Sequence, residues 1–490
     1  MKIPGVYIKE LNAFPNALVA VPTSVPAFIG YTETALRDDG KDLRNLPVRI
    51  GSLDEYRAYF GGPPAAKVRL TADGQRVDGI DLNSQFYLYN SLRLYFDNGG
   101  KTCYIVSAGL YADAVAKGKR GQDLSDAPLK ALAKELESTI IVVPDAMLLG
   151  DAGDARAVTE QVLAHCGAMQ SRIVICDIYR GDQRRSNDDQ DIISGAGGFR
   201  SLTSDFLSYG AAYYPWLHTS LIGDDQVDYR CLTPESLAAL IPFLKDAAAR
   251  SETDTAKRAE LQAAIDQLGA EEPAAGLHNM LMAALPAYKS LMQDVGAALN
   301  VLPPSGGIAG VYVRIDNVQG VHRAPANTGI NSALAPVVSI SAEEQEDLNL
   351  PLNGMAVNAI RVLAGRGMLI WGARTLDGNS QDWRYVNVRR TVIMLEQSIK
   401  AAMQAYMFEP NTSLTWGNVR SMIERFLTEQ WKAGVLIGGK PEDAYYVSVG
   451  PGASTTGGEA ARSYMLVSIK VSLVRPAEFI EITFQQLTQS

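Results

Sequence analysis

The sequence predicts a mixed α/β fold in several domains, with an extended strand-forming arm at each end of the chain. Three patterns lead to this prediction. Strand and helix patterns alternate through short turns between residues 26 and 232, which favours a largely parallel sheet. Residues 233–300 change to a composition rich in alanine, leucine, lysine and glutamate. Both ends of the chain carry strand-like residues instead of a helical period.

The first predicted segment is an arm over residues 1–25. Its strand-like residues Val6, Tyr7 and Ile8 lie between prolines, and proline lacks a backbone donor, so this stretch is extended chain and not helix. An extended arm carries unpaired backbone groups that can add to the edge of another sheet. Residues 6–8 are therefore candidate contact residues.

Residues 26–232 form the predicted α/β body. Strands are expected at residues 27–30, 103–107, 140–143, 173–178 and 211–217, and helices at residues 52–59, 86–96, 129–137 and 155–169. Ser52 and Glu55 have the spacing of a capping box at the start of the first helix. The stretch from Asp97 to Gly100 provides a glycine stop for the second helix.

Residues 233–300 are predicted to form a helical insertion, in which Leu237, Leu240 and Leu244 share one helical face. The composition shift favours an insertion packed on the outside of the body. The alternative is that this stretch belongs to the body itself.

Residues 301–476 form a predicted C-terminal domain, completed by part of the N-terminal region. Residues 303–307 are interpreted as a rigid turn, with Ser305 as a turn residue. Helices are expected at residues 386–408 and 416–431, and strands at residues 368–371, 445–449 and 465–474. Val419, Ile423 and Phe426 lie on one side of the second helix. Residues 477–490 alternate like a half-buried strand and form a second arm. The candidate contact residues of this second arm are Phe479, Ile480, Ile482 and Phe484.

Composition excludes several classes of protein. The chain has 490 residues, 47% of them apolar, and a formal charge of −9, which gives no basic footprint for nucleic acid. No apolar run approaches the roughly 18 residues of a membrane span, and no secretory signal is visible. The four cysteines are scattered and are interpreted as reduced, mostly buried thiols.

The candidate motifs for catalysis or cofactor binding lack the residue spacing or the secondary-structure context that their chemistry requires. Gly99-Gly100-Lys101-Thr102 resembles the end of a phosphate-binding loop, but Tyr95 occupies the place of the first glycine. A helix precedes this motif and a strand follows it, the reverse of what phosphate binding requires. The four histidines are far apart, and we expect no catalytic, cofactor or metal residues.

Several motifs resemble those of the contractile tail sheath family. They are Pro4-Gly5-Val6-Tyr7, Pro26-Ala27-Phe28-Ile29-Gly30, Phe96-Asp97-Asn98-Gly99-Gly100, Tyr214-Pro215-Trp216, Pro303-Pro304-Ser305-Gly306, Gly320-Val321-His322, Gly365-Arg366-Gly367, Trp371-Gly372-Ala373-Arg374, Asn387-Val388-Arg389-Arg390, Phe408-Glu409-Pro410-Asn411 and Arg475-Pro476-Ala477-Glu478. The resemblance is densest in the C-terminal half. Residues 352–358 and Gln319 depart from the family pattern, which leaves the subtype open.

The resemblance implies a structural subunit and not an enzyme, without a cofactor. Such subunits stack as six-fold rings around an inner tube, and contraction of the helical sleeve drives the tube into a target cell. The implied partners are further copies or paralogues of the chain, the inner tube protein, and baseplate and tail terminator or cap proteins. Neither nucleic acid nor direct membrane insertion is implied. The two arms resemble those that pair with a sheet in adjacent subunits, and Arg420, Arg425 and Lys432 are candidate tube-facing cations.

The implied location is an assembled particle. The chain would be made in the bacterial cytoplasm without a signal peptide, and the particle would be released by lysis or anchored at a membrane. Two alternatives stay open at this point. One is a nucleotide-dependent α/β enzyme, and the other is a different structural component of a tail or baseplate.

Overall fold

The computed structural model describes residues 18–186, 188–251, 254–270, 274, 276–351, 354–451 and 465–478. They form two compact units. We call residues 24–318 and 325–386 the central unit, and the described residues of 1–23, 319–324 and 387–490 the terminal unit. The five segments predicted from sequence do not follow these boundaries, and the terminal unit combines three separate stretches of chain.

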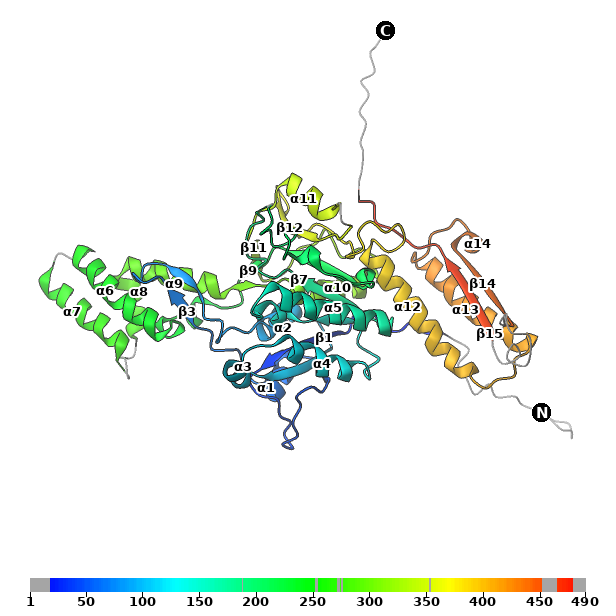
Figure 1. Ribbon diagram of the computed structural model, residues 1–490, viewed down its shortest axis with the longest axis horizontal. Helices are drawn as coiled ribbons and strands as arrows, with labels where there is room; N and C mark the ends of the chain where they lie inside the picture. The colour runs from blue at the N-terminus through cyan, green and yellow to red at the C-terminus, as the bar shows by residue number, and fades with distance from the viewer. Residues whose placement is uncertain are drawn as a thin grey trace, which may run out of the picture. The chain divides into compact units, whose positions relative to one another are not determined.

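The central unit contains an eight-stranded sheet in the order β13-β12-β8-β7-β6-β1-β5-β2 (Figure 1). Its strands are β1 (Pro26–Thr32), β2 (Val48–Ile50), β5 (Cys103–Leu110), β6 (Ile140–Val142), β7 (Ile173–Asp177), β8 (Gly210–Tyr214), β12 (Asn358–Leu363) and β13 (Gly367–Ile370). All neighbours from β12 to β5 pair in parallel, while β2 and β13 are antiparallel at the two edges. The predicted mixed α/β fold with a largely parallel sheet is therefore confirmed.

The sequences of the central strands are nearly continuous apolar runs because these strands are buried. Every residue of β1, β6, β7 and β8 is buried, as expected for parallel strands that are covered on both faces. The helices of the central unit outside residues 234–299 are α1 (Leu53–Phe60), α2 (Leu88–Asp97), α3 (Tyr111–Lys117), α4 (Gly121–Leu132), α5 (Ala152–Met169), α10 (Ser305–Gln319) and α11 (Ala342–Asn349). Ser52 caps α1 as predicted, because its side chain accepts the Glu55 amide at 3.2 Å. The helix expected at 129–137 lies further toward the N-terminus, as α4, where Leu124 is buried as well.

Helices α2 and α10 pack backbone against backbone. A Cβ added at Gly306 would lie 2.4 Å from the Ser91 carbonyl oxygen, and one added at Gly310 would lie 2.4 Å from the Tyr95 carbonyl oxygen. Two glycines one helical turn apart thus form the contact surface of α10. The interpretation of residues 303–307 as a rigid turn was wrong. Ser305 begins α10, and the first turn of this helix is buried against α2.

A small antiparallel sheet in the order β10-β9-β11 also belongs to the central unit. Its strands are β9 (Leu217–Thr219), β10 (Val301–Leu302) and β11 (Ala333–Pro336). Asn300 connects this sheet to the preceding chain, since its side chain accepts the Ile222 amide and donates to the Ile222 carbonyl, each at 2.9 Å. The sheet therefore holds the chain where residues 220–300 leave and return.

Residues 234–299 form helices with a hydrophobic core of their own. The helices are α6 (Pro234–Ser251), α7 (Thr255–Asp266), α8 (Leu277–Ala284) and α9 (Pro286–Leu299), drawn in green in Figure 1. Leu240, Leu244 and Ile265 are fully buried in this core, which the hairpin of β3 (Val68–Leu70) and β4 (Val77–Ile80) completes. The helical character expected for this stretch is present.

The terminal unit contains two long helices and a two-stranded sheet. The helices are α12 (Val386–Met403), α13 (Ser413–Lys432) and the short α14 (Pro441–Ala444), and the antiparallel strands are β14 (Tyr445–Pro451) and β15 (Met465–Val471). Met394 and Leu395 of α12 share one hydrophobic core with α13, β14 and β15. Leu18 is 7% exposed and belongs to the same core, so the chain entering from the N-terminus is part of this unit.

Candidate assembly surfaces

Helix α13 has one buried and one exposed face. Val419, Ile423 and Phe426 are buried, as their spacing predicted, and they belong to the core that the β14–β15 sheet covers. The opposite face carries Arg425 and Lys432, which lie seven residues and thus two turns apart. Glu429 is exposed on the same side, so this face of the helix carries charges of both signs.

The three candidate tube-facing cations are all exposed. The side chain of Arg420 is 55% exposed. The Nε of Arg420 donates to Glu424 Oε1 at 2.8 Å, and this contact raises the pKa of Arg420. The charge of Arg420 is therefore balanced within its own helix.

The β14–β15 sheet packs one face and exposes the other. Val447 is buried beneath the sheet, whereas Tyr446 of β14 and Leu466 of β15 are each 57% exposed on the opposite side. Among the described residues, each of these strands pairs only with the other. A two-stranded sheet is marginal by itself, and both outer strands have backbone groups facing away from the pair.

The predicted arm contacts lie outside the described residues. This holds for Val6, Tyr7 and Ile8 near the N-terminus, and for Phe479, Ile480, Ile482 and Phe484 near the C-terminus. Their pairing with another sheet stays a prediction. The structure describes the chain from which each arm departs, residues 18–23 and 472–478, and both stretches belong to the terminal unit.

The carboxyl edge of the central sheet is the place where open parallel sheets bind ligands. Here two buried aspartates occupy it. Asp145 accepts the amides of Tyr31 at 2.7 Å, Tyr87 at 2.6 Å and Leu88 at 3.2 Å, so that it covers the start of α2. Asp177 accepts the Ser305 amide at 2.9 Å and the Ser305 hydroxyl at 2.5 Å, at the start of α10.

Both carboxyl groups are strongly affected by their surroundings. Burial raises the pKa of Asp145 although three amides oppose the shift, and it raises the pKa of Asp177 to about 7 although Ser305 opposes it. The cavity beside Asp177 measures only about 10 Å³, less than a ligand needs. The helix N-termini that bind phosphates in other α/β proteins are thus satisfied here by the protein itself.

The glycine pair before Lys101 ends a helix, as the sequence indicated. The Gly99 amide donates to the Phe96 carbonyl at 3.1 Å, and the Gly100 amide donates to the Tyr95 carbonyl at 3.0 Å. Gly99 has a φ of +94°, which a glycine adopts without strain. These amides close the C-terminus of α2, so they do not converge on a phosphate.

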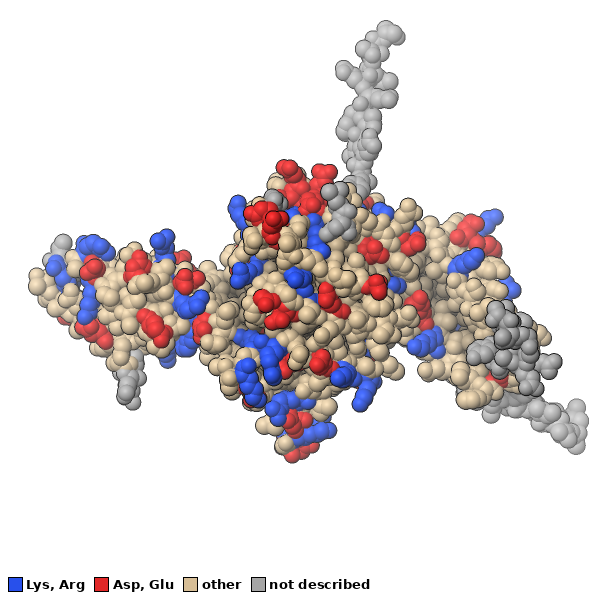
Figure 2. All heavy atoms as spheres, viewed as in Figure 1, with Lys and Arg blue, Asp and Glu red and all other residues tan. Residues whose placement is uncertain are grey.

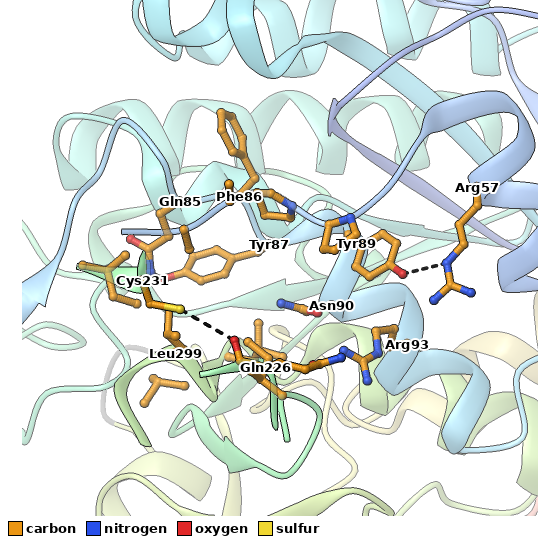
Figure 3. Close-up of a pocket in the computed structure, with 18 residues that line it drawn as sticks. Arg57, Gln85, Phe86, Tyr87, Tyr89, Asn90, Arg93, Gln226, Cys231 and Leu299 are labelled. Atoms are coloured by element: carbon orange, nitrogen blue, oxygen red, sulfur yellow. Dashed lines mark hydrogen bonds between the residues drawn. The ribbon is translucent and has the colours of Figure 1, made fainter. Parts of the chain in front are cut away.

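A larger cavity of about 430 Å³ is lined mainly by residues of α1, α2 and β10 and by the loops at residues 63–66 and 222–231 (Figure 3). Its wall combines aromatic and aliphatic side chains with the amides of Gln85, Asn90 and Gln226, and Arg57 and Arg93 lie on one side. Arg57 Nε donates to the Tyr89 hydroxyl at 2.9 Å, and the Cys231 thiol faces the Gln226 carbonyl at 3.7 Å. No histidine or carboxylate is among the residues that line the cavity.

The remaining titratable groups are dispersed. The four cysteines are free, and burial raises the pKa of Cys166 to about 12. Burial, with a smaller effect of Arg172, lowers the pKa of His165 to about 4. Within the described ranges, no three histidine, cysteine, aspartate or glutamate side chains gather as a metal site. Helices long and apolar enough to cross a bilayer are absent from the part of the chain that the structure describes.

Charges of both signs are interspersed on the face of the molecule shown in Figure 2, and acidic side chains gather over α11. Asp347 of this helix forms ion pairs with Arg185 at 2.5 Å and Arg200 at 2.9 Å. Partial burial opposes ionisation of Asp347, but the two arginines hold its pKa below the usual value. Arg185 and Arg200 are 4% exposed, so these cations fasten the loop after β7 to α11.

The sequence analysis did not identify several buried polar residues that hold the fold together. Asp145 and Asp177 each follow a buried strand, which is the signal that could have indicated their place at the sheet edge. Arg374, in a motif quoted above, is 1% exposed and donates to the carbonyls of Asn349 at 3.0 Å and Gly378 at 3.1 Å. This motif therefore holds loops together inside the central unit.

Comparison with known proteins places these features in context. The phage tail sheath C-terminal domain matches residues 379–486. The tail sheath protein of Salmonella phage ViI is 27% identical over 142 residues, which is 28% of this chain and 22% of that protein. The tail sheath protein of Enterobacteria phage T4 is 26% identical over 126 residues, 26% of this chain and 19% of that protein. The aligned region spans about a fifth of the length of these two relatives.

Solved structures match the chain from end to end. The sheath of the extracellular contractile injection system PVC, in its contracted state, has a TM-score of 0.60 and 26% identity, over 99% of this chain and 98% of that chain. The contracted helical sheath of the anti-feeding prophage has a TM-score of 0.61 and 28% identity, over 99% of both chains. A chain of the six-fold symmetrised baseplate of the anti-feeding prophage has a TM-score of 0.60 and 26% identity, over 100% of both chains.

These matches confirm the resemblance recognised from sequence. The C-terminal region is similar to a phage tail sheath domain, and the multi-domain fold is that of contractile sheath structures. The family to which the comparisons point is structural and not enzymatic.

Proposed function

We propose that this chain is the structural subunit of a contractile sheath, which polymerises as stacked six-fold rings around an inner tube and contracts to drive that tube into a target cell. The observation that carries the proposal is the end-to-end match to two contracted injection-system sheaths at 26–28% identity. The work of contraction comes from interfaces with two alternative arrangements that switch from ring to ring, without nucleotide hydrolysis in the sheath.

The open β14–β15 sheet supports a role for the arms. An arm strand from one neighbour along β14, and another along β15, would complete a four-stranded sheet over the core of the terminal unit. Backbone hydrogen bonds of this kind keep subunits joined while their side-chain surfaces slide past one another. We assign Val6, Tyr7 and Ile8 to one of these added strands, and Phe479, Ile480, Ile482 and Phe484 to the other.

The exposed cations of α13 support a tube-facing surface. Arg420, Arg425 and Lys432 would meet acidic groups of the inner tube protein. In the double variant Arg425→Glu/Lys432→Glu, we expect the isolated subunit to fold normally but to lose co-sedimentation with tubes. Unchanged co-sedimentation at physiological salt would contradict this assignment.

The remaining partners follow from the assembly. Similar chains occur in sheath and baseplate assemblies, and we infer that this chain contacts a baseplate and a terminator or cap protein. Its location is an assembled particle, phage tail or injection system, released by lysis or anchored at a membrane. We place residues 233–300 on the outer surface of the sleeve. Normal sleeves after removal of α7 would agree with this placement, and their loss would contradict it.

Electron microscopy of the protein alone, and co-expressed with the neighbouring tail genes, tests the proposal. Striated hollow sleeves wide enough to hold a tube are the expected result. Dispersed particles under every co-expression condition would overturn it. The match to a baseplate chain supports a second candidate, a sheath-like component of the baseplate. Rings attached to baseplates without any sleeves would favour that candidate.

A further inference from the structure

The N-terminal arm departs from a segment that α12 holds in place. We call residues 18–23 the N-terminal root. Its Val21 amide donates to Ser398 Oγ at 2.9 Å, and its Thr23 carbonyl accepts from Arg390 Nη2 at 3.0 Å. Leu18 is buried in the core that contains Met394. Thr23 thus lies beside an earlier turn of α12 than Val21 does, so the root runs antiparallel to the helix.

The C-terminal arm departs from a segment held by the first turn of the same helix. We call residues 472–474 the C-terminal root. Asn387 Nδ2 donates to the Val474 carbonyl at 3.2 Å and to the His322 carbonyl at 2.8 Å. Ser472 is bound as well, since its carbonyl accepts the Ile437 amide at 2.8 Å and its amide donates to the Ala444 carbonyl at 2.9 Å.

The three α12 side chains that make these bonds form a single stripe. Asn387, Arg390 and Ser398 are separated by three and eight residues, which brings them to one side of a helix. Their exposed fractions are 1%, 4% and 1%, so water does not compete for the bonds. The root atoms in the three bonds given above belong to the backbone. The stripe therefore holds the backbone of both roots, in addition to the anchoring of the N-terminal root by the buried Leu18.

We propose that Asn387, Arg390 and Ser398 form a clasp that sets the starting point of both arms and makes α12 the element through which a pull on one arm reaches the other. The proposal rests on the sheath function proposed above. Position matters because a strand that slips by one residue turns all its side chains to the opposite face. A root that slid along α12 would put its arm out of register with the neighbour's sheet. The three residues are thus positioning residues for the arms.

Two small substitutions test the clasp. Ser398→Ala removes the acceptor for Val21, and Asn387→Asp removes the amide donor while keeping the size of the side chain. Lys400→Ala is the matched control, because Lys400 is an exposed residue of the same helix. Hydrogen exchange of the Val21 amide, thermal unfolding of the free subunit, and the sedimentable sleeve fraction are measured for each variant beside the wild type.

We expect exchange at Val21 to rise about tenfold in Ser398→Ala, and the sleeve fraction to fall about fivefold or more in both variants, with Lys400→Ala unchanged. The comparison is made at a temperature where all free subunits are folded, so that a merely structural role leaves sleeve formation unaltered. Wild-type sleeve yields in both variants would overturn the clasp and leave the sheath function standing. Absence of sleeves from the wild type itself would overturn the sheath function, and the clasp with it.

Discussion

The central and terminal units close their sheets in opposite ways. In the central unit, the outer side of edge strand β13 is covered by its own chain, since the Asn327 amide donates to the Ile370 carbonyl at 2.7 Å and the Ile370 amide donates to the Thr328 carbonyl at 3.0 Å. In the terminal unit, the described residues provide β14 and β15 with no strand beyond each other. The edge at β13 is therefore covered by the chain itself, whereas we expect the β14–β15 sheet to accept added strands.

The same contrast holds for polar groups. In the central unit, Asp145 and Asp177 satisfy helix N-termini that would otherwise attract an anion. In the terminal unit, Arg425 and Lys432 are exposed, and the outer face of the β14–β15 sheet carries the exposed apolar residues Tyr446 and Leu466 beside serine and lysine. From this difference we infer that the two buried aspartates serve the stability of the central unit, and we expect the contacts with other chains to concentrate in the terminal unit. Substitutions in the central unit should therefore lower the stability of the free subunit, whereas deletions of the arms should prevent sleeve formation.

Removal of the arms should have the largest effect. Deleting residues 1–17, or residues 479–490, leaves both described units complete, so we expect a folded subunit with an unchanged unfolding midpoint and no long sleeves. Circular dichroism and electron microscopy measure the two properties. Deletion through residue 20 would remove the buried Leu18 as well and should destabilise the subunit by about 2 kcal/mol or more. Normal sleeves from both shorter deletions would refute the assignment of the arms.

The next largest effect is expected at the contact between α2 and α10. Gly310→Val places side-chain atoms where the Tyr95 carbonyl lies 2.4 Å from the Cβ position, so the helices must separate. We expect a loss of about 3 kcal/mol in the free energy of unfolding, measured by urea denaturation. A loss below about 1 kcal/mol would mean that the close approach of the two helices is not essential.

Asp177 should make the stability of the central unit depend on pH. Its folded pKa of about 7 lies above the unfolded value of about 3.9, so the folded state binds the proton more tightly. This contribution is fully present below pH of about 4 and is lost as the pH rises through 7, by up to about 1.4 kcal/mol per pH unit. Asp177→Asn removes it. Urea denaturation at pH 5 and pH 8 should show a larger decline for the wild type than for the variant, and equal declines would contradict the prediction.

The smallest effect is expected on the exposed side of α13. Gly417 has no atom within 4 Å of its Cβ position, in contrast to Gly310, and it lies inside the helix. Gly417→Ala should stabilise the free subunit by up to about 1 kcal/mol, because alanine favours helix more than glycine does. Thermal unfolding measures the gain. A destabilised variant would show that this side of α13 is not open in the free subunit, which would weaken the contrast between the two units.

The sequence by itself determined the elements that depend on neighbours in the chain. The apolar run at residues 27–30, the spacing of Val419, Ile423 and Phe426, and the glycine stop after Asp97 all led to elements found in the structure. Periodicity and helix stops depend on residues only a few positions apart, so they can be recognised in the sequence alone. The family motifs were legible for the same reason, as short runs of fixed residues.

Only the tertiary structure decided what depends on partners far away in the chain. Ser305 begins a helix because Asp177, 128 residues earlier, accepts its amide and hydroxyl, and because Gly306 allows α10 to touch α2. Val21 meets Ser398 across 377 residues. Such pairs have no local signature, since a buried polar group is satisfied by whichever partner the packed fold brings within reach. The strand order, the filled edge of the central sheet and the gathering of both roots on α12 are therefore properties of the folded chain.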